Sequence, residues 1–350
     1  MKRKSRKVKV GDMYIGGDAP ISIQSMTNTD TTNVDATVKQ INELEEVGCE
    51  VIRVSAPTIE AAKALKEIKK NIKIPLVADI HFDYRIAVEA AKYVDKLRIN
   101  PGNIGNEEKV KLVVDAAKNY NLPIRIGVNL GSLEKDLFDK YGYTAEAMVE
   151  SALRHVKILE ELDFYDTVVS LKASDVPRMV EAYRLFASKT DYPLHLGVTE
   201  AGSKVPGAIK SSMGFGILLN EGIGDTIRVS LSEDPVEEVK VGKRVLGALG
   251  LRKDGVEVTS CPTCARTHID VIKLVEEIES KTENIKKPIH LAVMGCAVNG
   301  PGESKKSDLG IVGGASDTNI LYKDGKIVGK VPKDKISETL LKEIDELNKE

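Results

Sequence analysis

Short apolar runs alternate with segments of helical periodicity through the first two-thirds of this chain. Such alternation is typical of a parallel sheet covered by helices. Eight repeats within about 250 residues match the size of a (β/α)8 barrel, the TIM barrel. The predicted strands are Ile21–Asn28, Glu50–Ala56, Leu76–His81, Lys96–Pro101, Ile124–Leu130, Thr167–Ala173, Leu194–Thr199 and Thr226–Leu231.

Helical periodicity between these runs predicts the outer layer of the barrel. Before the first run, Val8–Ile15 alternates around Gly11 and Asp12, which predicts a hairpin that plugs the lower end of the barrel. The clearest helical segments are Ala36–Val47, Ile59–Lys70, Glu107–Asn119 and Val176–Lys189.

The last third of the chain has a different pattern and predicts a second, smaller α/β domain. We expect residues 1–249 to form the barrel and residues 250–350 the small domain. The predicted elements are strands at Val256–Ser260, Ile289–Met294 and Leu309–Val312, a helix at Ile269–Ile278, a hairpin at Ile320–Val331 and a closing helix marked by Ile336, Leu340, Leu341, Ile344 and Leu347.

Polar side chains share one face of the predicted barrel strands, because side chains alternate along a strand. Their β-branched neighbours suit the outer face, so the polar set points inward, toward the end where barrels carry function. Four arginines and a lysine at one mouth predict a site for a multiply charged anion. A network of buried ion pairs is the alternative. The set is Arg53, Asp79, His81, Arg98, Asn100, Arg125, Asn129, Lys172, Arg228 and Ser230, with Glu200 at the end of the seventh strand.

Three cysteines cluster in the small domain, which suggests a metal or redox site. Cys261 follows a strand directly, Cys264 comes three residues later, and Cys296 follows the next strand. Zinc would need a fourth ligand, for which His268 or His290 is available. Glu303 closes the turn after Cys296, and three thiolates with an oxygen donor suit an iron–sulfur cluster with one exchangeable iron. Cys49 lies in a helical segment and is expected to be a buried core residue.

Composition excludes several functional classes. A net charge of −2, 4% aromatic residues and no Trp disfavour nucleic-acid binding. The sequence has no apolar run long enough for a transmembrane helix, and the basic start is followed by no apolar signal segment. Four cysteines are too few for a disulfide scaffold. We therefore expect a cytoplasmic protein with neither a membrane nor a nucleic-acid partner.

Six stretches, in order along the whole chain, resemble the 4-hydroxy-3-methylbut-2-enyl diphosphate synthase family. The length is that of its shorter, bacterial two-domain form. The stretches are Pro20–Thr31, Leu76–Phe82, Leu97–Asn103, Gly197–Gly202, Cys261–Cys264 and Gly295–Glu303.

The resemblance implies reductive dehydration and ring opening of 2-C-methyl-D-erythritol 2,4-cyclodiphosphate in isoprenoid biosynthesis. It also implies a [4Fe–4S] cluster, and ferredoxin or flavodoxin as electron donor. By motif, the cluster ligands would be Cys261, Cys264, Cys296 and Glu303. The residues that hold the diphosphate would be Arg53, Arg98, Arg125, Lys172, Asn129 and Ser230.

Family members are homodimers in which the cluster domain of one subunit closes over the barrel of the other. The short connection before Val256 fits such shared active sites. We assign Glu200 as the proton donor to the departing oxygen. Two alternatives remain: a sugar-phosphate aldolase or epimerase with Lys172 as Schiff-base former, and a zinc-ribbon nucleic-acid module, which the net charge disfavours.

Overall fold

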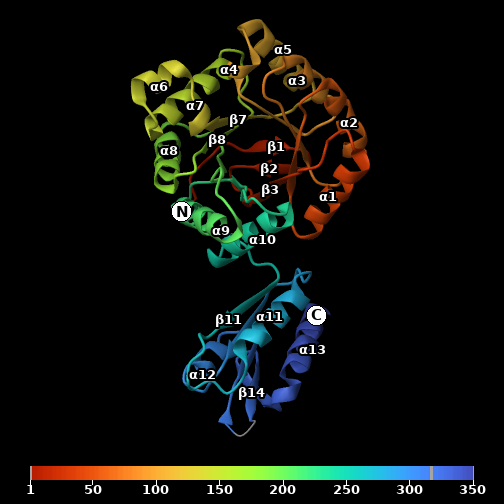
Figure 1. The fold of residues 1–350 in the computed structure, drawn as a ribbon, viewed down its shortest axis with the longest axis vertical. Coiled ribbons are helices and arrows are strands. Elements are labelled where there is room, and N and C mark those ends of the chain that lie inside the picture. The colour runs from red at the N-terminus through yellow and green to blue at the C-terminus, as the bar shows by residue number, and fades with distance from the viewer. Residues whose placement is uncertain (1, 316–317, 350) are drawn as a thin grey trace. The chain divides into compact units, whose positions relative to one another are not determined.

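The computed structural model describes residues 2–315 and 318–349 and contains two compact units, Met1–Leu251 and Arg252–Glu350 (Figure 1). The division falls two residues beyond the boundary that we expected after Leu249. Met1 and Glu350, the outer ends of the predicted domains, lie outside the described residues.

The first unit is the predicted barrel, seen end-on in Figure 1. Its parallel strands pair in the order β8-β7-β6-β5-β4-β3-β10-β9. A further parallel bridge between Val169 and Leu194 links β8 to the start of β9 and closes the ring. The strands are β3 (Ser22–Met26), β4 (Val51–Ser55), β5 (Leu76–Asp79), β6 (Lys96–Ile99), β7 (Ile124–Asn129), β8 (Thr167–Lys172), β9 (His195–Leu196) and β10 (Thr226–Ile227).

β9 and β10 are shorter than predicted, because their upper halves leave the regular ladder. Some hydrogen bonds continue past the strand ends: Arg228 N–H donates to the Leu196 carbonyl at 2.9 Å, and Thr199 N–H to the Ala173 carbonyl at 3.2 Å. The segments that carry Glu200 and Ser230 are therefore loops tied to the barrel rather than strand ends.

Helices surround the barrel, and several begin at a side-chain cap. Thr58, Asn106 and Thr144 each accept a hydrogen bond from the backbone N–H three residues later, which satisfies a free donor of the first turn. The helices are α1 (Val34–Glu46), α2 (Ile59–Lys70), α3 (Tyr84–Ala90), α4 (Pro101–Ile104), α5 (Glu107–Asn119), α6 (Lys135–Tyr141), α7 (Ala145–Glu160), α8 (Val176–Lys189), α9 (Lys204–Asn220) and α10 (Pro235–Ala248).

The hairpin β1 (Val8–Val10) and β2 (Met13–Ile15) closes the lower end of the barrel, as predicted. Val8, Val10 and Ile15 form a small buried cluster with Val168, an inward residue near the start of β8. The hairpin turns at Gly11 (φ +57°), where a side chain would meet Asp95 and Pro75, which precede β6 and β5. The contacts therefore lie at the amino-terminal ends of the strands.

The second unit is a five-stranded sheet in the order β11-β12-β13-β14-β15, in which β14 runs antiparallel to both of its neighbours and the other pairs are parallel. α11 (Val271–Thr282) and α13 (Ile336–Lys349) share an apolar core with one face of the sheet. α12 (Gly300–Ser304) packs against β12 and β13. The strands are β11 (Val256–Ser260), β12 (Ile289–Met294), β13 (Leu309–Val312), β14 (Asn319–Lys323) and β15 (Lys326–Val331).

Candidate active site and cluster site

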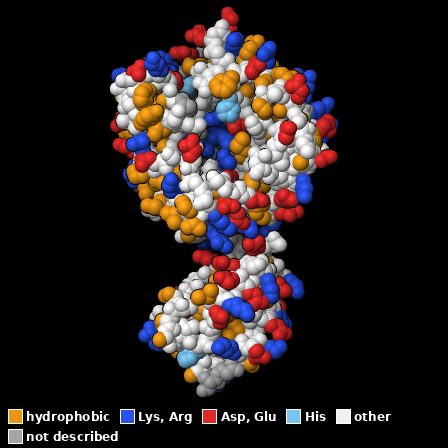
Figure 2. Space-filling model, viewed as in Figure 1, with side chains coloured by type: hydrophobic (Ala, Val, Ile, Leu, Met, Phe, Trp, Pro, Cys, Tyr) orange, Lys and Arg blue, Asp and Glu red, His pale blue; other side chains and the backbone are white. Residues whose placement is uncertain are grey.

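Charged side chains fill the inside of the barrel, where such barrels normally carry aliphatic residues. Figure 2 shows Lys and Arg side chains gathered at the centre of the barrel. The outward neighbours of these residues, such as Ile52, Val54 and Leu97, belong to the core beneath the helices. The alternation in the sequence therefore predicted the inward face correctly.

Arg98 connects three strands at the barrel mouth. Its Nη1 donates to Asp79 Oδ1 at 3.1 Å and lies 2.9 Å from His81 Nε2, and its Nη2 donates to the Gly127 carbonyl at 3.2 Å. Arg53 Nε lies 3.6 Å from the other oxygen of Asp79. Burial alone would raise the pKa of Asp79, but the guanidinium groups of Arg53 and Arg98 lower it to about 2. Asp79 is therefore ionised and holds both arginines.

Arg53 has poor partners for its remaining donors. Its Nε and Nη2 point to the thioether of Met26, at 3.1 and 2.8 Å, and sulfur is a weak acceptor. Burial, together with repulsion from Arg228 and Arg98, lowers the pKa of Arg53 to about 10 despite the attraction of Asp79. Its guanidinium group is thus available for a better acceptor.

Arg125 and Lys172 lie in the same interior without a carboxylate partner in the described parts of the chain. Arg125 is 1% exposed, and only its Nη1 is bonded, to Ser170 Oγ at 3.3 Å. Lys172 is buried above Gly197, where a Cβ would lie 2.8 Å from the lysine Cε and Nζ. Burial and the neighbouring arginines lower the pKa values of both groups.

Arg228 does have a carboxylate partner, which the sequence analysis missed. Its Nη2 lies 3.3 Å from Glu238 Oε2 in the first turn of α10. Glu238 also accepts hydrogen bonds from Ser25 Oγ and the Leu231 backbone. For Arg228 the ion-pair alternative is therefore right.

For the set as a whole, buried cations outnumber carboxylates. Only Asp79 and Glu238 supply buried negative charge against the cationic side chains in the described part of the barrel interior. Uncompensated buried charge is costly, so this interior is built for an anionic ligand. The basic side chains are the buried Arg53, Lys96, Arg98, Arg125 and Lys172 and the half-buried Arg228.

The other predicted mouth residues differ in position. Asn129 is half-buried at the end of β7, Ser230 is half-buried in the loop after β10, and His81 is exposed beside Arg98. Glu200 is exposed and has φ +52°. The other described non-glycine residues with positive φ are Asn or Asp, which tolerate this region better. Backbone strain of this kind concentrates at functional sites.

The predicted cluster ligands lie on one edge of the small sheet. Cys261 follows β11, and its Sγ accepts the Gly295 N–H at 3.1 Å, which brings it beside the loop of Cys296. Cys264 is exposed, and a backbone hydrogen bond from Arg266 lowers the pKa of its thiol. Glu303 is half-buried in α12.

These side chains share an edge but do not converge. Within residues 2–315 and 318–349, no three His, Cys, Asp or Glu side chains are arranged to hold a metal ion. The donor chemistry nevertheless fits a cluster, because thiolates are the usual ligands of iron–sulfur centres and ligand loops commonly order on metal binding.

The two histidines considered for zinc have different positions. His290 lies at the start of β12, about 13 Å along the strand from the end that precedes Cys296. Its Nε2 lies 2.8 Å from Thr259 Oγ1. His290 therefore does not complete a site with Cys296. His268 stays beside the cysteines, since its N–H donates to the Gly295 carbonyl at 2.9 Å.

Comparison with known proteins identifies the family. Residues 5–243 match the family model of the GcpE TIM-barrel domain, and residues 257–346 that of the GcpE protein C-terminal domain. A 4-hydroxy-3-methylbut-2-en-1-yl diphosphate synthase (flavodoxin) from Caldanaerobacter subterraneus is 59% identical over 100% of this chain and 99% of its own. The chain belongs to this family. The enzyme class and the role in isoprenoid biosynthesis that the resemblance implied are thereby confirmed.

Other members are similarly close. The synthase (flavodoxin) of Ruminiclostridium cellulolyticum is 56% identical over 99% of this chain and 98% of its own length. That of Clostridium perfringens is 57% identical over 98% of this chain and 99% of its own length. The aldolase or epimerase and the zinc-ribbon module are thus set aside.

Solved structures share the barrel fold alone. A truncated 3-deoxy-D-arabino-heptulosonate 7-phosphate synthase from Thermotoga maritima covers 71% of this chain and 94% of its own, with TM-score 0.52 and 15% identity. The match to a dihydropteroate synthase from Stenotrophomonas maltophilia covers 71% of this chain and 100% of that enzyme, with TM-score 0.51 and 12% identity. In the described residues, no helix is long and apolar enough to cross a membrane.

Sequence reasoning missed Gln24, Lys96 and His195, which are completely or almost completely buried deeper in the barrel. Each falls on the inward phase of its strand, and Lys96 precedes Arg98 by two residues. Extending the alternation one step back from Arg98 would have found Lys96, whereas the strands of Gln24 and His195 carried no predicted inward residue from which to extend it.

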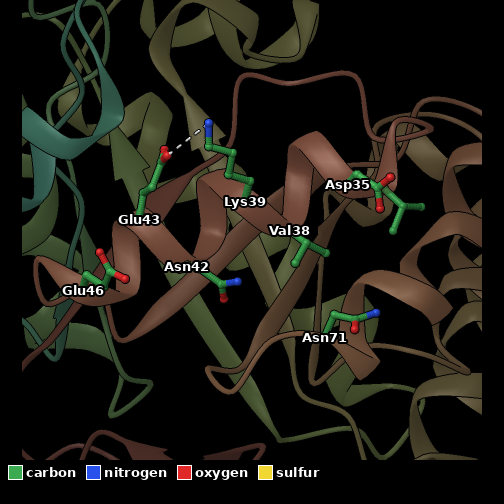
Figure 3. A pocket seen from close by; sticks show the side chains of 8 residues that line it. Asp35, Val38, Lys39, Asn42, Glu43, Glu46 and Asn71 are labelled. Atoms are coloured by element: carbon green, nitrogen blue, oxygen red, sulfur yellow. Dashed lines mark ion pairs between the residues drawn. The ribbon is translucent and has the colours of Figure 1, made fainter.

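A second hollow, of about 450 Å³, lies on the outer surface of α1 (Figure 3). Its lining includes Asp35, Glu43 and Glu46, and Lys39 is paired with Glu43 at 3.8 Å. This excess of negative charge is the wrong sign for a diphosphate, so the barrel mouth is the candidate active site.

Proposed function

We propose that the barrel mouth binds the diphosphate of 2-C-methyl-D-erythritol 2,4-cyclodiphosphate, which the enzyme opens and reduces to 4-hydroxy-3-methylbut-2-enyl diphosphate. The excess of buried cations over carboxylates carries this proposal. Arginine forks suit phosphate oxygens, and lysine adds a point charge. Arg53, Arg125 and Lys172 are the principal ligands, because their donors have the weakest partners or none.

The remaining mouth residues have supporting roles. Asp79 keeps Arg53 and Arg98 oriented, and its ionised carboxylate limits the total positive charge. His81, Asn129 and Ser230 line the rim, where they contact the carbon skeleton or the phosphate oxygens.

Glu200 donates the proton to the oxygen that departs as water. It is exposed just beyond β9, and its left-handed backbone fixes where the side chain begins. A carboxyl group held at the rim can reach a bound substrate without occupying the phosphate site.

Cys261, Cys264, Cys296 and Glu303 hold a [4Fe–4S] cluster in this proposal. When bound, such a cluster supplies electrons and a Lewis-acidic iron. Their shared position at the edge of β11 and β12 supports this ligand set. Flavodoxin is the proposed reductant, because the names of the relatives specify it; ferredoxin is the alternative that the resemblance also allowed.

We further propose a homodimer with active sites shared between subunits. α9 exposes Val205, Ile209, Met213 and Ile217 at four-residue spacing, an apolar stripe suited to a partner surface. The connection between α10 and β11, residues 249–255, spans at most about 25 Å.

The four cysteines are free thiols, which fits a reducing cytoplasm.

Binding of the cyclodiphosphate to Arg53→Gln, Arg125→Gln and Lys172→Met tests the phosphate site. Each change removes a charged hydrogen-bond donor and should weaken binding about ten- to a hundredfold. Arg184→Gln makes the same chemical change on the outer surface, where Arg184 pairs with Glu221, and should leave affinity unchanged. Retained melting temperatures would show that the variants fold, and unchanged affinity in all three would overturn the proposal.

A further inference from the structure

Lys96 is a charged group that the proposed phosphate site does not use. It begins β6, two residues before Arg98 on the same inner face, and so lies about 7 Å deeper along the strand. Its side chain is 0% exposed, and its Nζ has no hydrogen-bond partner among the described residues. The apolar cluster of the hairpin closes the barrel below this level.

No carboxylate in the described barrel is left to neutralise Lys96. Asp95, its neighbour in the chain, accepts hydrogen bonds from Lys69 Nζ at 2.5 Å and the Leu76 N–H at 2.7 Å. The charged and titratable groups that act on Lys96 are Arg125 on β7, Arg53 on β4 and His195 on β9, besides Asp95 next to it in the chain. Asp79, Arg98, Lys172 and Arg228 lie nearer the mouth, toward the carboxyl ends of their strands.

An ammonium group in such surroundings is unstable relative to the neutral amine. Burial, followed by repulsion from Arg125 and Arg53, lowers the pKa of Lys96 well below its usual value. Burial, followed by repulsion from Arg125, Lys172 and Lys96, also lowers the pKa of His195, whose ring nitrogens have no partner in the described chain. Burial and the neighbouring cations therefore favour the neutral amine of Lys96 over its ammonium form while no anion is bound.

We propose that binding of the cyclic diphosphate at the mouth is coupled to uptake of one proton from solvent by Lys96. The full positive charge of the barrel then forms only once the anion is present. This inference rests on the proposed function, which places two negative charges among Arg53, Arg125 and Lys172. Those charges make the local potential less positive and favour the ammonium form of Lys96.

The direction of the pH dependence follows. The pKa of Lys96 is low in the free enzyme and higher in the complex, so binding takes up a proton between these two values. In that window the affinity falls by about tenfold for each pH unit of increase. A monoanion would shift the potential less, so the coupling favours a doubly charged ligand.

Isothermal titration calorimetry of the full-length, cluster-containing enzyme tests this under anaerobic conditions. The ligand is 2-C-methyl-D-erythritol 2,4-cyclodiphosphate, whose two phosphorus centres each carry one strongly acidic oxygen and do not titrate near pH 7. Buffers of different ionisation enthalpy give the number of protons taken up. We compare the unchanged enzyme with Lys96→Met and with Thr226→Val, which removes an equally buried and unpartnered hydroxyl but no charge.

The unchanged enzyme and Thr226→Val should take up about one proton more per bound ligand than Lys96→Met. The affinities of the unchanged enzyme and Lys96→Met should differ at low pH and converge as pH rises. If Lys96→Met does not fold, Lys96→Gln serves the same comparison. Binding with equal proton numbers overturns the coupling but leaves the proposed function intact, whereas absence of any binding heat and of turnover overturns the proposed function.

Discussion

Asn100, which follows β6, and Gly127 of the neighbouring β7 are joined by two hydrogen bonds at the barrel mouth. The Gly127 N–H donates to Asn100 Oδ1 at 2.8 Å, and Asn100 Nδ2 donates to the Gly127 carbonyl at 2.8 Å. The same carbonyl accepts a hydrogen bond from Arg98. The side-chain amide of Asn100, which the sequence analysis assigned to the substrate, is therefore occupied by β7 and positions Arg98 through the shared carbonyl.

Replacing Asn100 with Ala should test this positioning role. It leaves the Gly127 N–H unpaired and removes one of the two donors to the Gly127 carbonyl, and it should lower the free energy of unfolding by about 1–3 kcal/mol. Substrate affinity should fall through Arg98, so Arg98→Gln should add little to the loss caused by Asn100→Ala. Chemical denaturation and calorimetry measure both effects. Asn119→Ala, an exposed change at the end of α5, should alter neither.

Asp79 should make stability depend on pH in the acid range. Its pKa is about 2 in the folded chain, below its usual value of about 3.9. Because its pKa is depressed, ionised Asp79 contributes on the order of 2 kcal/mol to the free energy of unfolding. This contribution is complete above about pH 4 and is lost as the pH falls toward 2. Urea unfolding of the unchanged chain should show this loss of stability. In Asp79→Asn the loss over the same pH range should be smaller by the contribution of Asp79.

Gly197→Ala should displace Lys172 without unfolding the barrel. The added Cβ would lie 2.8 Å from the lysine Cε and Nζ, and this flexible end can move. We expect weaker cyclodiphosphate binding, in the direction of Lys172→Met, at a nearly unchanged melting temperature. Equal affinity in the variant and the parent would show that Lys172 does not need its present position.

Iron content should separate the cysteines. Ser replacement of Cys261, Cys264 or Cys296 should each lower bound iron after anaerobic purification, because each removes a thiolate ligand. Cys49→Ser is the matched control: burial raises the pKa of the Cys49 thiol to about 12, so it remains a neutral core group. Full iron content in Cys296→Ser would refute the ligand set.

Shared active sites should allow two inactive variants to restore each other. After subunit exchange between Glu200→Gln and Cys264→Ser, about half of the dimers are mixed, and each has one intact site. About a quarter of the parental activity should therefore return. Sites built within one chain would give no recovery.

Local periodicity was sufficient to predict the inward face of the barrel. Arg53, Arg98, Arg125 and Lys172 lie on it because side chains alternate within a strand, whatever the neighbouring strand does. The helix bounds of α2, α5 and α8 also agree with the predictions, and each begins at a capping side chain.

Contacts between elements could not be predicted in this way. The pairing of Arg228 with Glu238 depends on where the first turn of α10 packs, and the two bonds of Asn100 depend on the register of β7. The cysteines could be placed at one edge from their strands, but convergence of their thiols requires loop conformations that no strand period specifies.

The hairpin beneath the barrel determines how ligands come and go. Since β1 and β2 close the lower end, substrate and product use the same opening and cannot pass one another. The product keeps its diphosphate, so the positive charges that bind the substrate also slow the release of the product. We therefore expect product departure to limit turnover, and we expect moderate salt, which screens those charges, to speed the enzyme before it weakens substrate binding.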